Sequence, residues 1–128
     1  MAKSVVSENA PRPVGPYSQA IVTNGFVFCS GQIGIDPAIG KLVPGGSADE
    51  ARQCLRNLSH VLATAGLSFK DVVRTTVFVT DLSGFKEINE AYGSFLSEPF
   101  PARTTVQVAA LPLGAKVEID AIAEMRGH

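Results

Sequence analysis

Residues 47–66 read SADEARQCLRNLSHVLATAG and give the strongest structural signal in the chain. Apolar side chains recur at the spacing of one helical face, at positions 51, 54, 55, 58, 61, 62 and 65. Ser47 with Glu50 three residues later has the form of a capping box, and Gly66 suits the left-handed position that follows a helix. The stretch therefore predicts an amphipathic helix at roughly 48–65.

A second helix is predicted at roughly 83–97. Its apolar residues have the same spacing: Phe85, Ile88, Tyr92, Phe95 and Leu96. Asp81 and Ser83 are candidate N-caps, and Pro99 and Pro101 prevent the helix from continuing.

Segments rich in β-branched and aromatic residues predict the strands Ser18–Thr23, Phe26–Ile33, Val72–Thr80, Arg103–Ala109 and Lys116–Glu124. Asn24-Gly25 is a hairpin turn signal between the first two. The order of elements predicts a single domain, residues 1–128, of the α+β class, with both helices packed on one face of the sheet. The opposite face then still carries apolar residues, which predicts that a partner subunit covers it.

Composition limits the classes of function. A hydrophobic content of 45% is enough for one core, and a net charge of -1 gives no basic footprint for nucleic acid. Cys29 and Cys54 have the spacing of neither a disulfide framework nor a metal box. The N-terminal run lacks the apolar segment of a signal peptide, and no apolar window is long enough to span a membrane. We therefore expect a cytoplasmic protein with no membrane or nucleic-acid partner.

The familiar catalytic motifs are missing: there is no Gly-rich phosphate loop, HExxH, paired CxxC or nucleophile elbow. This argues against metal, nucleotide and covalent-triad chemistry. His60 and His128 have no carboxylate or cysteine beside them in sequence, so we expect both to be solvated or at the edge of the core. Polar residues on strands remain as candidates.

Two strands carry such residues. The period of two places Arg103, Thr105 and Gln107 on one face of the fourth strand. Glu118 and Asp120 share one face of the last strand. Because the connection between these strands is short, they are candidate hairpin neighbours, which would group the five polar side chains. This grouping is a hypothesis, since a slip of one residue inverts it.

Arg103 has two interpretations of similar weight on physical grounds. In the first, Arg103 forms a surface ion pair with a nearby acid. In the second, the rigid fork of N–H donors on its guanidinium holds the carboxylate of a small organic acid. Glu118 by itself is more typical of a solvated strand acid, yet beside a bound iminium it would orient water or transfer a proton.

Five segments together resemble the Rid family, also called YjgF-like, and its RidA branch in particular. They are Gly15-Pro16-Tyr17-Ser18-Gln19-Ala20, Ser30-Gly31-Gln32-Ile33-Gly34, Thr75-Thr76-Val77-Phe78-Val79 with Asp81-Leu82, Phe100-Pro101-Ala102-Arg103-Thr104, and Val117-Glu118-Ile119-Asp120-Ala121-Ile122-Ala123. They occur in the right order and run essentially from end to end, which makes the resemblance specific.

The resemblance implies a chorismate-mutase-like α+β fold with a mixed sheet, assembled as a homotrimer with intersubunit clefts. It implies hydrolytic deamination of 2-aminoacrylate and 2-aminocrotonate, through their imine tautomers 2-iminopropanoate and 2-iminobutanoate, to 2-keto acids and ammonia. Small 2-imino acids would be the substrates of this hydrolase, and no cofactor or metal would take part.

It also implies roles for individual residues. Arg103 would be the carboxylate clamp and Glu118 the acid that positions the attacking water. Tyr17, Ser30, Gly31 and Asn89 match other positions that line the family's cleft. The other interpretations of these four are a packing aromatic for Tyr17, a bulge or bend at Ser30-Gly31 and a solvent-facing helix residue for Asn89.

Thr105 departs from the family pattern, since many bacterial members have a cysteine two residues after the clamp arginine. A role for a thiol is therefore in doubt here, and the contact with substrate would come from the backbone of Thr105, which any residue can offer.

Two alternatives of other classes remain open. The first is a non-enzymatic trimer that binds a ligand or acts as a chaperone, because architecture alone does not determine function. The second is an endoribonuclease, against which the near-neutral charge, 7% aromatic content and lack of a catalytic histidine pair count.

Overall fold

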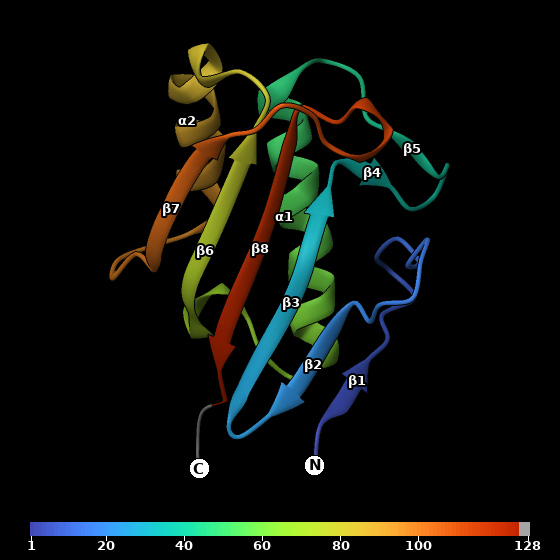
Figure 1. Cartoon of the computed structure of the whole chain (residues 1–128). Coiled ribbons are helices and arrows are strands. Elements are labelled where there is room, and N and C mark those ends of the chain that lie inside the picture. The colour runs from blue at the N-terminus through green and yellow to red at the C-terminus, as the bar shows by residue number, and fades with distance from the viewer. Residues whose placement is uncertain (126–128) are drawn as a thin grey trace.

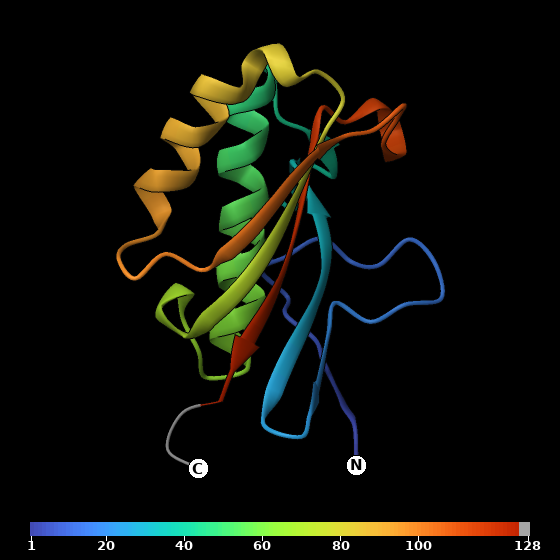
Figure 2. The same cartoon turned by 60° about the vertical axis from the view of Figure 1, so that its left-hand side comes forward.

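The computed structural model describes residues 1–125 and has a six-stranded sheet with two helices on one face (Figures 1 and 2). The sheet has the order β1-β2-β3-β8-β6-β7, with every pair of neighbours antiparallel except β6 and β7. Its strands are β1 (Lys3–Val5), β2 (Ala20–Thr23), β3 (Phe26–Ile33), β6 (Val72–Val79), β7 (Ala102–Gln107) and β8 (Val117–Glu124). The α+β class and the mixed sheet are confirmed.

The helices are α1 (Ser47–Thr64) and α2 (Phe85–Phe95). Two short strands, β4 (Ile35–Asp36) and β5 (Lys41–Leu42), pair in a separate hairpin. Single 3-10 turns occupy Phe69–Asp71, Leu82–Gly84 and Pro112–Gly114. The sequence did not predict β1, β4 and β5, because two or three residues are too few to show a periodicity.

The core lies between α1 and the inner face of the sheet. The apolar residues of α1 at positions 51, 54, 55, 58, 61 and 62 are all buried, as the periodicity predicted. They pack with Val27 of β3 and with Val117 and Ile119 of β8, each with no exposed surface. Burial of this helical stripe fixes the sheet face that α1 covers.

The capping box predicted for α1 is wrong. Gly46 is the N-cap residue, and no side chain caps this end of the helix. Glu50 is buried, and its Oε1 accepts a hydrogen bond from the backbone N–H of Lys116 at 2.8 Å. At the other end Gly66 has φ of +79°, the left-handed conformation expected of it.

The second helix is shorter than predicted. Leu82–Gly84 forms a 3-10 turn before α2 begins, and the Asp81 side chain accepts from the N–H of Ser83 at 2.9 Å. Asp81 therefore caps the 3-10 turn. Ile88, Tyr92 and Leu96 are buried as expected, whereas Phe85 is exposed at the start of the helix.

The predicted neighbourhood of the last two strands is also wrong, because β6 lies between β7 and β8. Short connections favour hairpins, but here residues 108–116 pass β6 and join β7 to β8 on its other side. The chain between β6 and β7 returns through α2, so these two strands run parallel. Within each strand the predicted alternation holds: Val117 and Ile119 are buried, and Glu118 and Asp120 face the opposite side.

The sheet face away from the helices is uncovered in the single chain. It carries exposed aromatic and aliphatic side chains, among them Phe26, Phe28 and Val106. The hairpin turn at Asn24-Gly25 is confirmed by their φ angles of +50° and +80°. In residues 1–125, no helix combines the length and the hydropathy that a membrane crossing requires.

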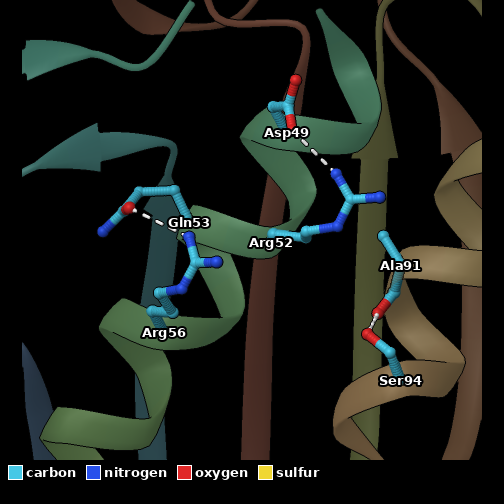
Figure 3. Close-up of polar contacts among 6 residues, drawn as sticks. All are labelled: Asp49, Arg52, Gln53, Arg56, Ala91 and Ser94. Atoms are coloured by element: carbon cyan, nitrogen blue, oxygen red, sulfur yellow. Dashed lines mark hydrogen bonds and ion pairs between the residues drawn. The ribbon is translucent and has the colours of Figure 1, made fainter. Parts of the chain in front are cut away.

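The outer surfaces of the helices carry local polar contacts (Figure 3). Asp49 and Arg52 form an ion pair at 2.7 Å on α1, and Ser94 donates to the carbonyl of Ala91 on α2. These contacts join residues three apart on one helix, so they support the helices and lie apart from the sheet residues considered next.

Candidate active site

The two residues with the sharpest predicted roles lie on opposite faces of the sheet. Glu118 pairs with Phe78 across β8 and β6, and Phe78 pairs with Val106 of β7. Paired residues point to the same face, so Glu118 faces the uncovered side. Arg103 pairs with the buried Thr75 and faces α2.

Arg103 is held against aromatic rings of α2. Its guanidinium carbon lies 4.9 Å from the centroid of Tyr92 and 5.6 Å from that of Phe85. The Tyr92 hydroxyl is itself 2.7 Å from Oγ1 of Thr75, a hydrogen bond inside the core. In residues 1–125 Arg103 forms no ion pair, which removes the surface-pair interpretation within one chain.

Two buried oxygen atoms near Arg103 have no hydrogen-bond partner in the described structure: Oδ1 of Asn89 and Oγ1 of Thr105. Asn89 lies on the side of α2 that carries Phe85 and Tyr92, and Thr105 shares the face of β7 with Arg103. Buried polar atoms are nearly always paired, so two unpaired ones beside a cation are a feature expected of a ligand site.

Glu118 lies in a cavity of about 230 Å³ on the other face, which Tyr17 and Gly31 also line. Gly31 is required there, because a Cβ on it would lie 2.8 Å from the carboxyl carbon of Glu118. A side chain at position 31 would therefore displace the carboxylate. Of the seven predicted site residues, the structure brings together Glu118, Tyr17 and Gly31 here, and places Asn89 and Thr105 on the elements that surround Arg103.

Burial raises the pKa of the Glu118 carboxyl, and the nearby Asp120 carboxylate raises it further. Asp120 is held by the backbone N–H of Thr76, which donates to its Oδ1 at 3.0 Å. A carboxyl with a raised pKa is a stronger base once ionised, so Glu118 is a better proton acceptor than an ordinary glutamate.

Ser30 is occupied by structural contacts. Its hydroxyl donates to the carbonyl of Ser18 at 2.6 Å, and its N–H donates to that of Gln19 at 2.9 Å. The pairing of β3 with β8 shifts between Cys29 and Gln32, so the bulge interpretation of Ser30-Gly31 is confirmed. Ser30 is not among the residues that line the cavity.

The remaining candidates carry no chemistry in this structure. Cys29 is a buried residue of β3, and burial followed by the Asp120 charge raises the pKa of its thiol to about 12. His60 is exposed on α1, and His128 lies outside the described residues. Within residues 1–125 no group of three or more His, Cys, Asp or Glu residues is arranged to hold a metal ion.

Sequence reasoning missed the support of Arg103 by Tyr92 and Phe85, since both aromatics were interpreted as core residues. The spacing contained a signal: Phe85, Asn89 and Tyr92 lie four and three residues apart and share one helical side. Only the parallel pairing of β7 with β6 brings that side of α2 to Arg103.

Comparisons with a family model, with curated proteins and with solved structures each match nearly the whole chain. Residues 7–125 match the model of the family described as Endoribonuclease L-PSP. The chain is 47% identical over 121 residues to the 2-iminobutanoate/2-iminopropanoate deaminase of Bos taurus, covering 94% of this chain and 88% of that protein.

Two solved structures have folds very similar to that of this chain. RidA from the Antarctic bacterium Psychrobacter sp. PAMC 21119 has a TM-score of 0.93 and 43% identity, over 96% of this chain and 99% of that one. TdcF of E. coli with bound serine has a TM-score of 0.90 and 41% identity, over 95% of this chain and 98% of that one.

Proposed function

The chain belongs to the Endoribonuclease L-PSP family, and we propose that it is a deaminase that hydrolyses the C=N bond of reactive 2-imino acids. Its substrates are 2-aminoacrylate and 2-aminocrotonate, through their tautomers 2-iminopropanoate and 2-iminobutanoate, and its products are 2-keto acids and ammonia. One observation carries this proposal: the guanidinium of Arg103 lies over the Tyr92 ring, and two unpaired buried oxygens lie on the same strand face and on the same side of α2.

Arg103 binds the carboxylate of the substrate through its donor fork. Stacking on Tyr92 limits the rotation of the guanidinium, so the fork is oriented before the substrate arrives. Oδ1 of Asn89 only accepts hydrogen bonds, which suits a protonated imine nitrogen, and the Thr105 hydroxyl donates to the carboxylate. In this assignment the Thr105 side chain, and not only its backbone, contacts the substrate.

Glu118 activates the water. Its carboxylate takes a proton while the water oxygen bonds to C2 of the iminium, which gives a tetrahedral carbinolamine. Glu118 returns the proton to nitrogen. Its carboxylate then takes the hydroxyl proton of the carbinolamine while the C–N bond breaks, so that the ketone forms and ammonia leaves. The raised pKa of Glu118 supports both transfers, because burial and the Asp120 charge make its carboxylate a stronger base than an ordinary glutamate.

The site is completed by a second copy of the chain. Arg103 and Glu118 face opposite sides of one sheet, so a substrate of three or four carbons cannot contact both within a chain. A neighbouring copy that packs on the uncovered face brings its own Arg103 to the cavity of Glu118. The exposed Phe26, Phe28 and Val106 supply the apolar contact. Repeating this contact in a closed ring of three copies, the assembly that the family resemblance implies, gives a homotrimer with three equivalent clefts.

The family description favours one competing function, an endoribonuclease. Cleavage of RNA calls for phosphate-binding cations and a proton-transfer pair. The chain has a net charge of -1 and two histidines, of which His60 is exposed on α1 away from both clusters. The deaminase accounts for Arg103 and Glu118, and the nuclease accounts for neither.

The test is release of ammonia and 2-keto acid from 2-aminocrotonate generated in situ, above the uncatalysed background. The wild-type chain accelerates it and Arg103→Ala does not. Arg52→Ala, which removes an arginine from a surface pair on α1, keeps full activity. Acceleration by Arg103→Ala equal to wild type would overturn the assignment of the clamp.

Glu118→Ala separates an enzyme from a binding protein. A deaminase variant without this carboxylate keeps affinity for the 2-keto acid product and loses turnover, because Glu118 acts on the water rather than on the carboxylate of the substrate. If Glu118→Ala turns over substrate as wild type does, Glu118 is not the base.

A further inference from the structure

The helix α1 buries three polar side chains among its apolar ones. Glu50, Gln53 and Asn57 lie three and four residues apart on one side of the helix and are 5%, 8% and 0% exposed. A buried polar group costs free energy unless it is hydrogen-bonded, and an apolar pair of similar shape is about equally stable. The hydrogen-bond partners of these side chains show what they contribute.

Asn57 holds the junction between β3 and β4. Its Nδ2 donates to the carbonyl oxygens of Ile33, at 3.3 Å, and of Ile35, at 2.9 Å. Its Oδ1 accepts from Nε2 of Gln53 at 3.0 Å, and Oε1 of Gln53 accepts from the exposed Arg56 (Figure 3). Both N–H donors of the Asn57 amide are thus used, and the bond from Gln53 fixes which end of this amide faces the strands.

Two further contacts join α1 to the start of β8. Oε1 of Glu50 accepts from the backbone N–H of Lys116 at 2.8 Å. Sγ of Cys54 donates to the carbonyl oxygen of Val117 at 3.6 Å. Between β3 and β4 the chain passes so close to the helix that a Cβ on Gly34 would lie 2.9 Å from Cα of Glu50. Residues 50–57 therefore hold the end of β3 and the beginning of β8 together, on the helix side of the sheet (Figure 2).

The backbone atoms that α1 holds lie next to Glu118. Lys116 and Val117 directly precede it, and Ile33 is the residue of β3 that pairs with it. The bulge at Ser30-Gly31 interrupts the pairing of β3 with β8, so only two residue pairs join these strands beyond it. The Glu118 carboxyl lies against Gly31 in that bulge. Since two pairs are a short ladder, the fit of the carboxyl against the bulge depends on the contacts with α1.

We propose that Asn57 and Glu50 are positioning residues for the base: from the helix side they fix the ends of β3 and β8, and so hold the Glu118 carboxylate against Gly31. The inference rests on the proposed function, in which Glu118 takes a proton from the attacking water. The contacts are buried within one chain, so they do not depend on a second copy at the uncovered face.

Asn57→Ala removes both donors and frees the end of β3. Because burial is the larger cause of the raised pKa of Glu118, a looser bulge that admits water lowers this pKa. We expect kcat to fall by about five- to tenfold, since the base becomes weaker and less well placed. KM should stay within about twofold of wild type, because Arg103 binds the carboxylate of the substrate.

The pKa of Glu118 is measured without turnover by NMR titration of its carboxyl carbon. Several ionisable groups surround Glu118 and are left unchanged by the variants: Asp120 on β8, Arg12 and Tyr17 at the cavity, Cys54 on α1 and, in the proposed assembly, Arg103 of a neighbouring copy. A shift in the pKa of Glu118 therefore reports a change in its burial.

Glu50 provides a matched pair of variants, which also carries the test if Asn57→Ala does not fold. Glu50→Ala removes the acceptor of the Lys116 N–H and should lower kcat and the pKa of Glu118 as Asn57→Ala does. Glu50→Gln keeps an oxygen that accepts from this N–H, so it should restore kcat to within about twofold of wild type.

Val61→Ala is the control for stability. It removes buried apolar volume from the same helix and no hydrogen bond, so it destabilises the fold and should leave the pKa of Glu118 unchanged. Urea denaturation of every variant establishes that the kinetics and the titration are measured on folded protein.

The outcomes separate the inference from the proposed function. Unchanged kcat and unchanged pKa of Glu118 in folded Asn57→Ala and Glu50→Ala overturn the inference, and so does an equal loss of kcat in Val61→Ala or in Glu50→Gln. If the wild-type chain deaminates no imino acid while the pKa of Glu118 falls in Asn57→Ala and Glu50→Ala, the proposed function fails and the placement of Glu118 by α1 stands.

Discussion

The charge of Asp120 contributes to the base strength of Glu118. The two carboxylates lie two residues apart on the same face of β8, and Asp120 is fixed by the N–H of Thr76. Burial is the larger cause of the raised pKa of Glu118, and the Asp120 charge is the second. Removing that charge while keeping the side-chain oxygen should therefore lower the pKa of Glu118 without moving the strand.

Asp120→Asn gives a prediction about pH. Since the active form of Glu118 is ionised, kcat/KM falls as pH drops through the pKa of this carboxyl. A lower pKa moves this acid limb to lower pH in Asp120→Asn, and the plateau at higher pH stays or falls slightly. The measurement is the pH profile of kcat/KM for both proteins, and an acid limb that stays in place would exclude Asp120 as a cause.

Two substitutions of Tyr92 separate its contribution to stability from its contribution to the position of Arg103. Tyr92→Phe keeps the ring beneath Arg103 but leaves Oγ1 of Thr75 without its partner, so we expect a loss of about 1–2 kcal/mol in the free energy of unfolding. KM for the imino acid should change by less than about twofold.

Tyr92→Leu removes the π face, and the freed guanidinium should raise KM by about three- to tenfold. Urea denaturation and steady-state kinetics on both variants provide the measurements. Equal KM in the two variants would mean that the ring does not position Arg103.

At the level of elements, the start of α1 gives the next prediction. Ser47→Ala should cost less than about 0.5 kcal/mol, since Ser47 caps no backbone N–H, whereas a true N-cap serine would cost about 1 kcal/mol. Glu50→Ala should cost at least about 1–3 kcal/mol, because it leaves the N–H of Lys116 without an acceptor in a buried place.

Denaturation of Ser47→Ala and Glu50→Ala, beside Glu87→Ala as an exposed acid in the first turn of α2, measures this difference. A larger loss for Ser47→Ala than for Glu50→Ala would restore the capping box that the sequence predicted.

The sequence predicted the helices and strands better than the contacts between them. The periodicity of α1 is local, and its bounds were correct to within one residue at each end. The function of Glu50 was not predictable, because its partner Lys116 is 66 residues away. The neighbours of β7 were predicted wrongly for the same reason: the position of β6 between β7 and β8 depends on packing of the whole sheet, which the local sequence of residues 108–116 does not encode.

For the whole molecule, the resemblance identified the candidate residues, but only the fold divides them. Arg103, Thr105 and Asn89 gather at α2, and Tyr17, Gly31 and Glu118 gather on the uncovered face. Alternate residues of a strand face opposite sides of the sheet, and this alternation separates the two groups. Which side each group faces follows from the register of β6 with both β7 and β8. A single chain therefore holds two half-sites.

A mixing experiment tests whether the half-sites meet between copies. Arg103→Ala retains the half-site of Glu118, and Glu118→Gln retains that of Arg103, so each homo-oligomer alone should be inactive. When equal amounts are unfolded and refolded together, a site is intact only where a chain that keeps Arg103 lies beside a chain that keeps Glu118. Random assembly of a closed ring makes this true for about one site in four, so activity should return to about a quarter of wild type.

The mixture's activity must also depend on exchange between copies. When the folded variants are mixed without unfolding, little activity appears if the oligomers do not exchange subunits. If they exchange subunits fully, activity again reaches about a quarter of wild type. The double variant Arg103→Ala/Glu118→Gln, refolded with wild type in equal amounts, also leaves about a quarter of the sites intact and serves as the calibration. If the refolded single variants stay inactive while this calibration mixture is active, Arg103 and Glu118 do not act across an interface. The two half-sites would then be separate sites within one chain.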